Sequence, residues 1–179
     1  ALRKGEQYQT EKLAQLLKNI DVSGKSEEEA GVSLAALVEE SNRRFIESKL
    51  NIPFDVWYSE DEKLRATGAN DAMLAELSDK GLTYERDGAV WLKTSEYGDD
   101  EDRVVVRSDL SKSYFISDIT YHQDKFARGF DTVIDVWGAD HHGQVKSLHA
   151  GMEALGYPRG EPEILLGQFV KLMQGGREV

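Results

Sequence analysis

The stretch 132–143 reads TVIDVWGADHHG and joins a mostly apolar segment to a turn rich in polar residues. We predict a strand at 132–136, a helix at 140–155 and a second apolar strand at 163–170. Strand, helix and strand joined by short connections are typical of a right-handed βαβ unit on a parallel sheet. The sequence therefore indicates an α/β fold.

The turn that follows the first of these strands is a candidate ligand site, because ligands of open α/β sheets bind beyond the carboxyl ends of strands. Gly138 would let a ligand approach the backbone, and Asp140 could accept hydrogen bonds from a ribose diol. His141 and His142 could donate to a base or a phosphate. Alternatively, Asp140 caps the helix and the two histidines are surface residues.

A metal site is not expected at this turn. Adjacent residues on a helix diverge by ~100°, whereas metal-binding pairs usually lie three or four residues apart. The remaining histidines, His122 and His149, complete no recognisable zinc spacing.

A predicted helix at 114–126 carries a second candidate site. Tyr114 and Asp118 lie four residues apart and therefore share one helix face. A carboxylate beside a phenol hydroxyl suits a planar guanidinium, which donates two parallel N–H bonds. Alternatively, Asp118 is an exposed acid in the first helical turn, where negative charge is favourable. The charges later in this helix are expected to be solvated: Asp124, Lys125 and Arg128.

The N-terminal part of the chain is predicted to be mainly helical. Residues 6–50 have helical character, and within them Ser26 and Glu29 have the spacing of a capping box. Pro53 ends this region, and the aromatic stretch 54–58 predicts a short strand.

Short helices and a small sheet are predicted from residue 59 to residue 107. Ser59 with Glu62 begins a helical stretch, and Asn70 is expected to cap a helix that ends near Gly81. An Asp87–Gly88 turn favours a hairpin. The expected strands are 82–84, 89–93 and 104–107, and the acidic stretch 96–102 is expected to be a solvated loop.

Composition narrows the class of protein. The chain has 179 residues, of which 40% are hydrophobic, so it can bury a core of its own. A net charge of −11 disfavours non-specific binding to nucleic acid, and the absence of cysteine excludes disulfides and thiolate metal sites. No apolar run approaches ~18 residues. We expect a soluble cytoplasmic protein with no membrane contact.

Several linked motifs in the second half resemble the catalytic domain of bacterial arginyl-tRNA synthetases. The matching runs are 84–92 (YERDGAVWL), 96–104 (EYGDDEDRV), 114–122 (YFISDITYH), 125–131 (KFARGFD) and 136–143 (VWGADHHG). The resemblance is dense over residues 51–179, whereas residues 1–50 match only by placement and helical character.

The resemblance implies a class I synthetase fold. It predicts a partial Rossmann-like α/β catalytic domain with a helical and small β insertion. Residues 1–107 would contain the insertion, and residues 108–179 the second half of the nucleotide-binding fold.

The resemblance also implies roles for individual residues. Tyr114 and Asp118 match a YxxxD pattern that contacts the arginine substrate, with the Asp at the guanidinium. Gly138, Asp140 and His141 match an element beside the adenosine ribose, and His142 is assigned to the arginine pocket. Which histidine faces the ligand stays open. No residue of this chain is expected to be a catalytic nucleophile.

The activity implied is that of an arginine–tRNA ligase, which uses ATP, together with Mg²⁺, to join L-arginine to tRNA-Arg. The chain has no HIGH-type sequence and stops where a KMSK-type loop is expected, so it is interpreted as a fragment that is inactive alone. Little nucleic-acid binding is expected from this acidic piece. The alternative is a non-catalytic amino-acid or nucleotide-binding module derived from the same fold.

Overall fold

The computed structural model describes residues 18, 21, 23–168 and 170–178. The chain divides into two compact units, Ala1–Trp57 and Tyr58–Val179. Within the described residues, no helix is both long enough and apolar enough to cross a membrane.

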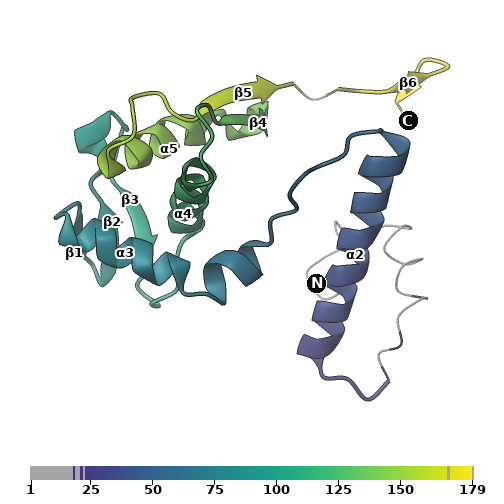
Figure 1. Ribbon diagram of the computed structural model, residues 1–179, viewed down its shortest axis with the longest axis horizontal. Coiled ribbons are helices and arrows are strands. Elements are labelled where there is room, and N and C mark those ends of the chain that lie inside the picture. The colour runs from purple at the N-terminus through teal and green to yellow at the C-terminus, as the bar shows by residue number, and fades with distance from the viewer. Residues whose placement is uncertain (1–17, 19–20, 22, 169, 179) are drawn as a thin grey trace. The chain divides into compact units, whose positions relative to one another are not determined.

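The first unit contains helix α2 (Glu27–Lys49), which begins at the predicted capping box (Figure 1). The Ser26 hydroxyl accepts from the Glu29 amide at 3.2 Å, and the Glu29 carboxylate accepts from the Ser26 amide at 2.8 Å. The strand predicted at 54–58 is wrong, because this segment is irregular and has no strand partner among the described residues. The helix predicted from residue 6 begins outside the described residues.

The second unit opens with two short helical segments. The Glu62 amide donates to the Ser59 hydroxyl at 3.3 Å, as predicted, and a π-helical turn follows at Asp61–Arg65. Helix α3 spans Ala69–Asp79, with Gly68 rather than Asn70 at its N-cap. Asn70 is buried because its side chain donates to the Ser117 hydroxyl at 2.9 Å instead of capping its own helix.

A three-stranded antiparallel sheet follows α3 and confirms the predicted hairpin. Its strands are β1 (Thr83–Arg86), β2 (Ala89–Leu92) and β3 (Arg103–Val106), in the order β1-β2-β3. Asp87 and Gly88 both have positive φ, at 53° and 72°, which is the geometry of a type I′ turn.

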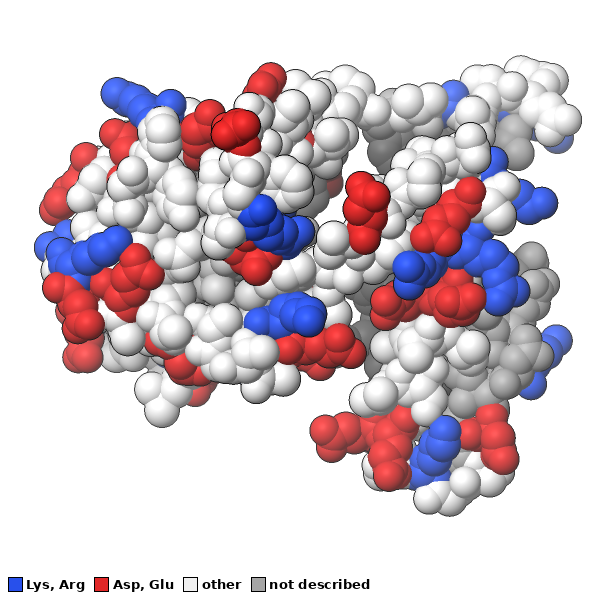
Figure 2. Space-filling model, in the orientation of Figure 1, with Lys and Arg blue, Asp and Glu red and all other residues white. Residues whose placement is uncertain are grey.

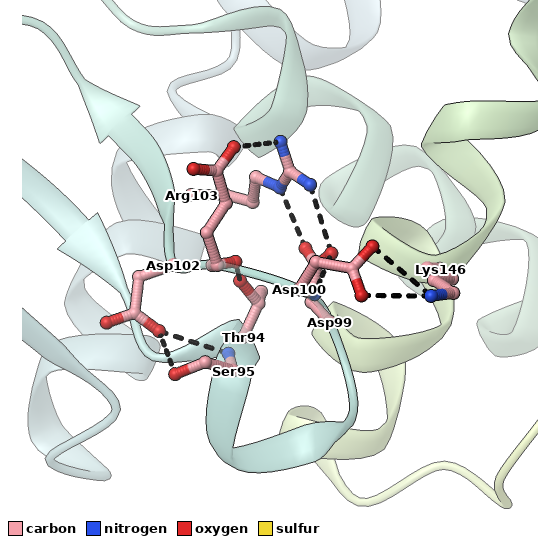
Figure 3. A network of polar contacts seen from close by, with 8 residues as sticks. Thr94, Ser95, Asp99, Asp100, Asp102, Arg103 and Lys146 are labelled. Atoms are coloured by element: carbon pink, nitrogen blue, oxygen red, sulfur yellow. Dashed lines mark hydrogen bonds and ion pairs between the residues drawn. The ribbon is translucent and has the colours of Figure 1, made fainter.

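The acidic stretch between β2 and β3 is a mostly exposed loop, as predicted, but Asp99 within it is buried. It contains a short 3₁₀ helix, Thr94–Tyr97, and a buried Asp99 whose carboxylate accepts two bonds from Arg103, at 2.7 and 3.0 Å. Burial opposes ionisation of Asp99, but the hydrogen bonds from Arg103, the Asp100 amide and Ser147, together with the Arg103 charge, outweigh it and lower the pKa of Asp99. Figure 3 shows Lys146 reaching Asp100 from a helix distant in sequence.

The remaining elements confirm the predicted parallel βαβ unit. Helix α4 spans Tyr114–Ala127, and strand β4 (Ile134–Gly138) leads through a 3₁₀ turn (Ala139–His141) into helix α5 (His142–Leu155). Strand β5 (Glu163–Gly167) pairs with β4 in parallel (Figure 1). Strands β6 (Met173–Gln174) and β7 (Arg177–Glu178) form a further antiparallel pair.

One hydrophobic core joins the helices of the second unit to its antiparallel sheet. Helix α4 contributes Ile116 and Ile119, and α5 contributes Leu148 and Met152, all four 2% exposed or less. Helices α4 and α5 approach closely at Gly151, where an added Cβ would lie 2.8 Å from the Ile119 Cδ1 atom. A larger residue at position 151 would therefore force the Ile119 side chain or the helices themselves to shift.

We expect Gly151→Ala to lower the free energy of unfolding by about 1–2 kcal/mol. Overpacking a closed core usually costs about 1–3 kcal/mol, which exceeds the ~1 kcal/mol that alanine gains over glycine in a helix. Urea denaturation followed by circular dichroism measures the change. The control is Gly143→Ala in the same helix, where an added Cβ meets nothing within 4 Å; it should be neutral or stabilising. Equal effects of the two substitutions would contradict the packing argument.

Candidate functional site

Helix α4 places Tyr114 and Asp118 one turn apart, as predicted, but in different surroundings. Tyr114 is 74% exposed and lines a cavity of about 430 Å³. Asp118 is half-buried and does not line that cavity. Within the described residues, the Asp118 carboxylate has no hydrogen-bond partner. It is therefore a partly buried carboxylate that remains open to a ligand.

The surroundings of Asp118 favour the neutral form of its carboxyl group more than water does. Burial raises the pKa of its carboxyl group to about 6, although the nearby His122 and Lys125 side chains act in the opposite direction. The charges of Glu60 and Asp135 reinforce the increase. A cation bound at Asp118 would stabilise the carboxylate and lower this pKa again.

A buried ionic cluster lies beside Asp118 and consists of His122, Lys125 and Asp135. The Asp135 carboxylate, on β4, contacts the His122 Nε2 atom and accepts from the Lys125 ammonium at 2.5 Å. Burial opposes ionisation of Asp135, but bonds from His122 and Lys125 outweigh it and lower its pKa. Lys125 is thus not the solvated charge that the sequence suggested. Asp124 and Arg128 pair with each other near the same helix end.

The His122 ring has polar contacts on both sides. Its Nδ1 atom lies 2.6 Å from the backbone carbonyl oxygen of Asp118, which can only accept. Its Nε2 atom contacts the Asp135 carboxylate and lies 3.3 Å from the Lys125 ammonium nitrogen. This ring connects the backbone at Asp118 directly to strand β4.

Sequence reasoning missed this cluster, although two signals were present. Residues 118, 122 and 125 share one helix face at spacings of four and three. Asp135 stands within an otherwise apolar predicted strand, and a buried acid needs charged partners. No spacing in the sequence, however, links α4 to β4.

The second set of predicted site residues lies where β4 ends. Gly138 is the last residue of the strand, and a Cβ at this position would lie 2.4 Å from the Asp140 Oδ1 atom. Asp140 and His141 are exposed, with 83% and 51% of their side-chain surfaces accessible. The His142 Nδ1 atom lies 3.2 Å from the Ala139 carbonyl oxygen. Asp140 makes no cap hydrogen bond to the helix, and its exposed carboxylate lies 3.7 Å from the His141 Nε2 atom.

Strand β4 connects the candidate residues on α4 with those that follow the strand, and the two sets do not contact each other directly. Asp135 of this strand contacts His122 of α4, and Gly138 ends the same strand three residues later. No hydrogen bond or ion pair among the described residues joins His142 to Tyr114 or Asp118. Among those residues, no group of three or more acidic or histidine side chains is arranged to hold a metal ion.

Comparisons with known proteins agree on one family. The profile described as "tRNA synthetases class I (R), catalytic domain" matches residues 3–171. An arginine–tRNA ligase from Aquifex aeolicus is 52% identical over 132 residues, which is 74% of this chain and 22% of that protein. Arginine–tRNA ligase 1 from Halalkalibacterium halodurans is 47% identical over 131 residues, covering 73% of this chain and 23% of that protein.

Solved structures show the same fold. A protein described as a putative arginyl-tRNA synthetase from Campylobacter jejuni matches 99% of this chain and 41% of its own length, with a TM-score of 0.79 and 30% identity. The Thermus thermophilus arginyl-tRNA synthetase matches 87% of this chain and 34% of its own length, with a TM-score of 0.59 and 18% identity. The chain thus spans less than half of each solved relative and less than a quarter of the two curated ones.

Removing the carboxylate of the ionic cluster should destabilise the second unit strongly. In Asp135→Asn, the Lys125 ammonium would lose its carboxylate partner in the protein interior, and the His122 ring would lose its acidic contact on β4. We expect the free energy of unfolding to fall by about 3 kcal/mol, as when one partner of a buried ion pair is lost. Urea denaturation measures it, and the exposed Asp131→Asn is the matched control. A similar small effect of both substitutions would rule out a stabilising role for the cluster.

The raised pKa of Asp118 predicts a specific pH dependence. The folded protein holds this proton more tightly than the unfolded chain, whose Asp value is 3.8, so the associated stability is present at low pH. It is lost as pH rises from about 4 to about 6. The free energy of unfolding of Asp118→Asn, compared with that of the unsubstituted chain, should therefore rise by about 2 kcal/mol between pH 4 and pH 7. Urea denaturation of both proteins across this range measures the difference, and a constant difference would contradict the raised pKa.

Proposed function

Because this chain belongs to the catalytic-domain family of class I arginyl-tRNA synthetases, we propose that it is part of an arginine–tRNA ligase. The reaction has two steps. The carboxylate of L-arginine attacks the α-phosphorus of ATP, which gives arginyl-adenylate and pyrophosphate. A ribose hydroxyl of tRNA-Arg then takes the arginyl group. No covalent enzyme intermediate is needed, so the protein contributes orientation and electrostatic stabilisation.

The observation that carries this proposal is the unbonded, half-buried Asp118 carboxylate. A guanidinium can donate two parallel N–H bonds to it, whereas the lysine ammonium is a point charge that cannot reproduce this geometry. Binding of the cation also relieves the cost of burying the ionised acid. Tyr114, one turn away, and His142 complete the proposed arginine site. Asp118 would then be the residue that separates arginine from lysine.

The proposed nucleotide site lies at the carboxyl end of β4. Because Gly138 has no side chain, the Asp140 side chain can occupy the space beside it. The exposed Asp140 and His141 side chains can contact a ribose or a base. ATP is the nucleotide in this proposal. Mg²⁺ would be held mainly by the phosphates, because the described residues offer it no cluster of ligands. The proposal includes a cytoplasmic location, with which the cysteine-free composition agrees.

The exposed face of the two-stranded parallel sheet supports the proposed division of the fold at residues 107 and 108. Ile134 and Val136 are 53% and 77% exposed, and Leu165 beside them is 48% exposed. Apolar strand residues of parallel sheets are normally covered on both faces. We propose that residues 108–179 form the second half of a nucleotide-binding fold, and that another part of the longer protein covers this face. The 179 residues alone would then not aminoacylate tRNA.

The proposal is tested by Asp118→Asn in the full-length ligase that contains this chain. We expect the KM for L-arginine to rise at least tenfold, which corresponds to about 1.4 kcal/mol, because a charge-assisted bond is lost. The KM for ATP should change little. For the unsubstituted enzyme, the KM for arginine should fall as pH rises through about 6, where Asp118 ionises. Aminoacylation assays with varied arginine measure all three values.

The matched control is Asp124→Asn, which removes an acid from the same helix at a position paired with Arg128. It should change the KM for arginine less than twofold. An unchanged KM in Asp118→Asn, or the same increase in both variants, would refute the assigned role.

A further inference from the structure

A second candidate site lies in the cavity of about 430 Å³ at the N-terminus of α4. Residues from the π-helical turn, α3, the segment after β3 and the start of α4 line it. Three of its lining residues are cations, Arg65, Arg107 and Lys112, whereas Asp71 is its one acidic lining residue. Arg65 is paired with Asp61 at 3.2 Å and Lys112 with Asp71, so Arg107 is the lining cation without a described acidic partner.

Two polar groups that line the cavity have buried atoms without a hydrogen-bond partner. Asn70 is 2% exposed, and its Oδ1 atom is unpaired while its Nδ2 atom donates to the Ser117 hydroxyl. Because a hydroxyl both donates and accepts, the amide can turn over, keep this bond and present its NH₂ group to the cavity. The buried Ser113 hydroxyl is also unpaired. Unpaired buried polar groups are costly, so a ligand that pairs with them would bind favourably.

The backbone adds donors at the same place. Ser113 is the N-cap of α4 but makes no side-chain cap bond, and the first turn of the helix has no acidic residue. The first amides of a helix lack internal partners and carry a partial positive charge. They are therefore available to an anion in the cavity.

The cations retain capacity to bind. The described partners of Arg107, the Ser111 hydroxyl and the Lys112 carbonyl, are both bonded to its Nη1 atom, which leaves Nε and Nη2 without a described partner. The Lys112 ammonium lies 2.6 Å from Asp71 and has two further N–H donors. Arginine and lysine side chains in this arrangement are typical of sites for phosphate and carboxylate.

We propose that this cavity is an oxyanion-binding site that takes a phosphate or carboxylate group of a small ligand. Arg107 and Lys112 supply the charge, Asn70 and Ser113 supply buried donors, and the α4 N-terminus completes the shell. The Asp118 carboxylate repels anions and does not line the cavity, whereas Tyr114 lines the cavity and also belongs to the proposed arginine site. The proposed anion site does not depend on the proposed aminoacylation activity. All the groups named for it belong to this 179-residue chain.

The test is a titration of the chain, labelled with ¹⁵N, against inorganic phosphate and against acetate, each compared with chloride at the same ionic strength. We expect saturable amide shifts at Lys112, Ser113 and the first turn of α4. Saturation by phosphate with little effect of acetate would identify a phosphate site, and the reverse would identify a carboxylate site. Shifts that are non-saturable, that chloride reproduces, or that spread over the surface would overturn the proposal.

Two variants locate the site, and one control accounts for net charge. Arg107→Gln and Lys112→Gln should each weaken binding about tenfold or more, as expected from loss of a charge-assisted bond. Arg128→Gln removes the same charge near the other end of α4 and should leave the affinity unchanged. The spectra themselves report whether each variant is folded, and two positions are tested in case one substitution disrupts the fold. Equal weakening in all three variants would refute a localised site.

Discussion

Helix α4 meets α5 where Gly151 has no side chain, and the position of the candidate site depends on this contact. An added Cβ at Gly151 would meet the Ile119 side chain at 2.8 Å and the Phe115 ring at 3.3 Å, so the side chains of α4 pack directly against the backbone of α5. Tyr114, Asp118 and His122 all lie on α4, and His142 begins α5. Because cores are densely packed, a shift at this contact would move both groups of residues together.

Charged side chains add a second constraint by connecting elements that are distant in sequence. The Asp135 carboxylate joins β4 to α4 through His122 and Lys125, and Lys146 joins α5 to the acidic segment before β3 (Figure 3). Each buried acid of these networks, Asp99 and Asp135, has cationic partners and a lowered pKa. Asp118 differs, because it is partly buried without a hydrogen-bond partner and its pKa is raised. Perturbed acids of this kind are common at functional sites.

Net charge and local charge have different consequences for binding. On the face shown in Figure 2, acidic and basic side chains are interspersed, in keeping with an overall charge that disfavours polyanions. The cavity at the α4 N-terminus nevertheless gathers three cations and two unpaired buried polar groups. A small oxyanion interacts mainly with its immediate surroundings, since charges beyond about 10 Å are screened at moderate ionic strength. An acidic protein can therefore contain a selective anion site.

The sequence by itself determined the elements whose signals are local. Periodicity predicted α4 and α5, the Asp87–Gly88 pair predicted the hairpin turn, and Ser26 with Glu29 predicted the start of α2. Apolar runs separated by a helix predicted the parallel pairing of β4 and β5. The same patterns place Tyr114 and Asp118 on one helix and Gly138 and Asp140 at a strand end, although their roles stay predictions.

Only the tertiary structure decided which charges are buried and which atoms lack partners. Lys125 and the stretch 96–102 read as solvated, yet both enter ion pairs, because their partners come from β4, β3 and α5. The aromatic stretch 54–58 has strand propensity, but a strand needs a neighbour to pair with and none of the described residues provides one. The cavity at α4 likewise requires four segments that no sequence spacing relates. Burial and pairing are properties of contacts between distant residues, whereas periodicity and turn chemistry act between neighbours.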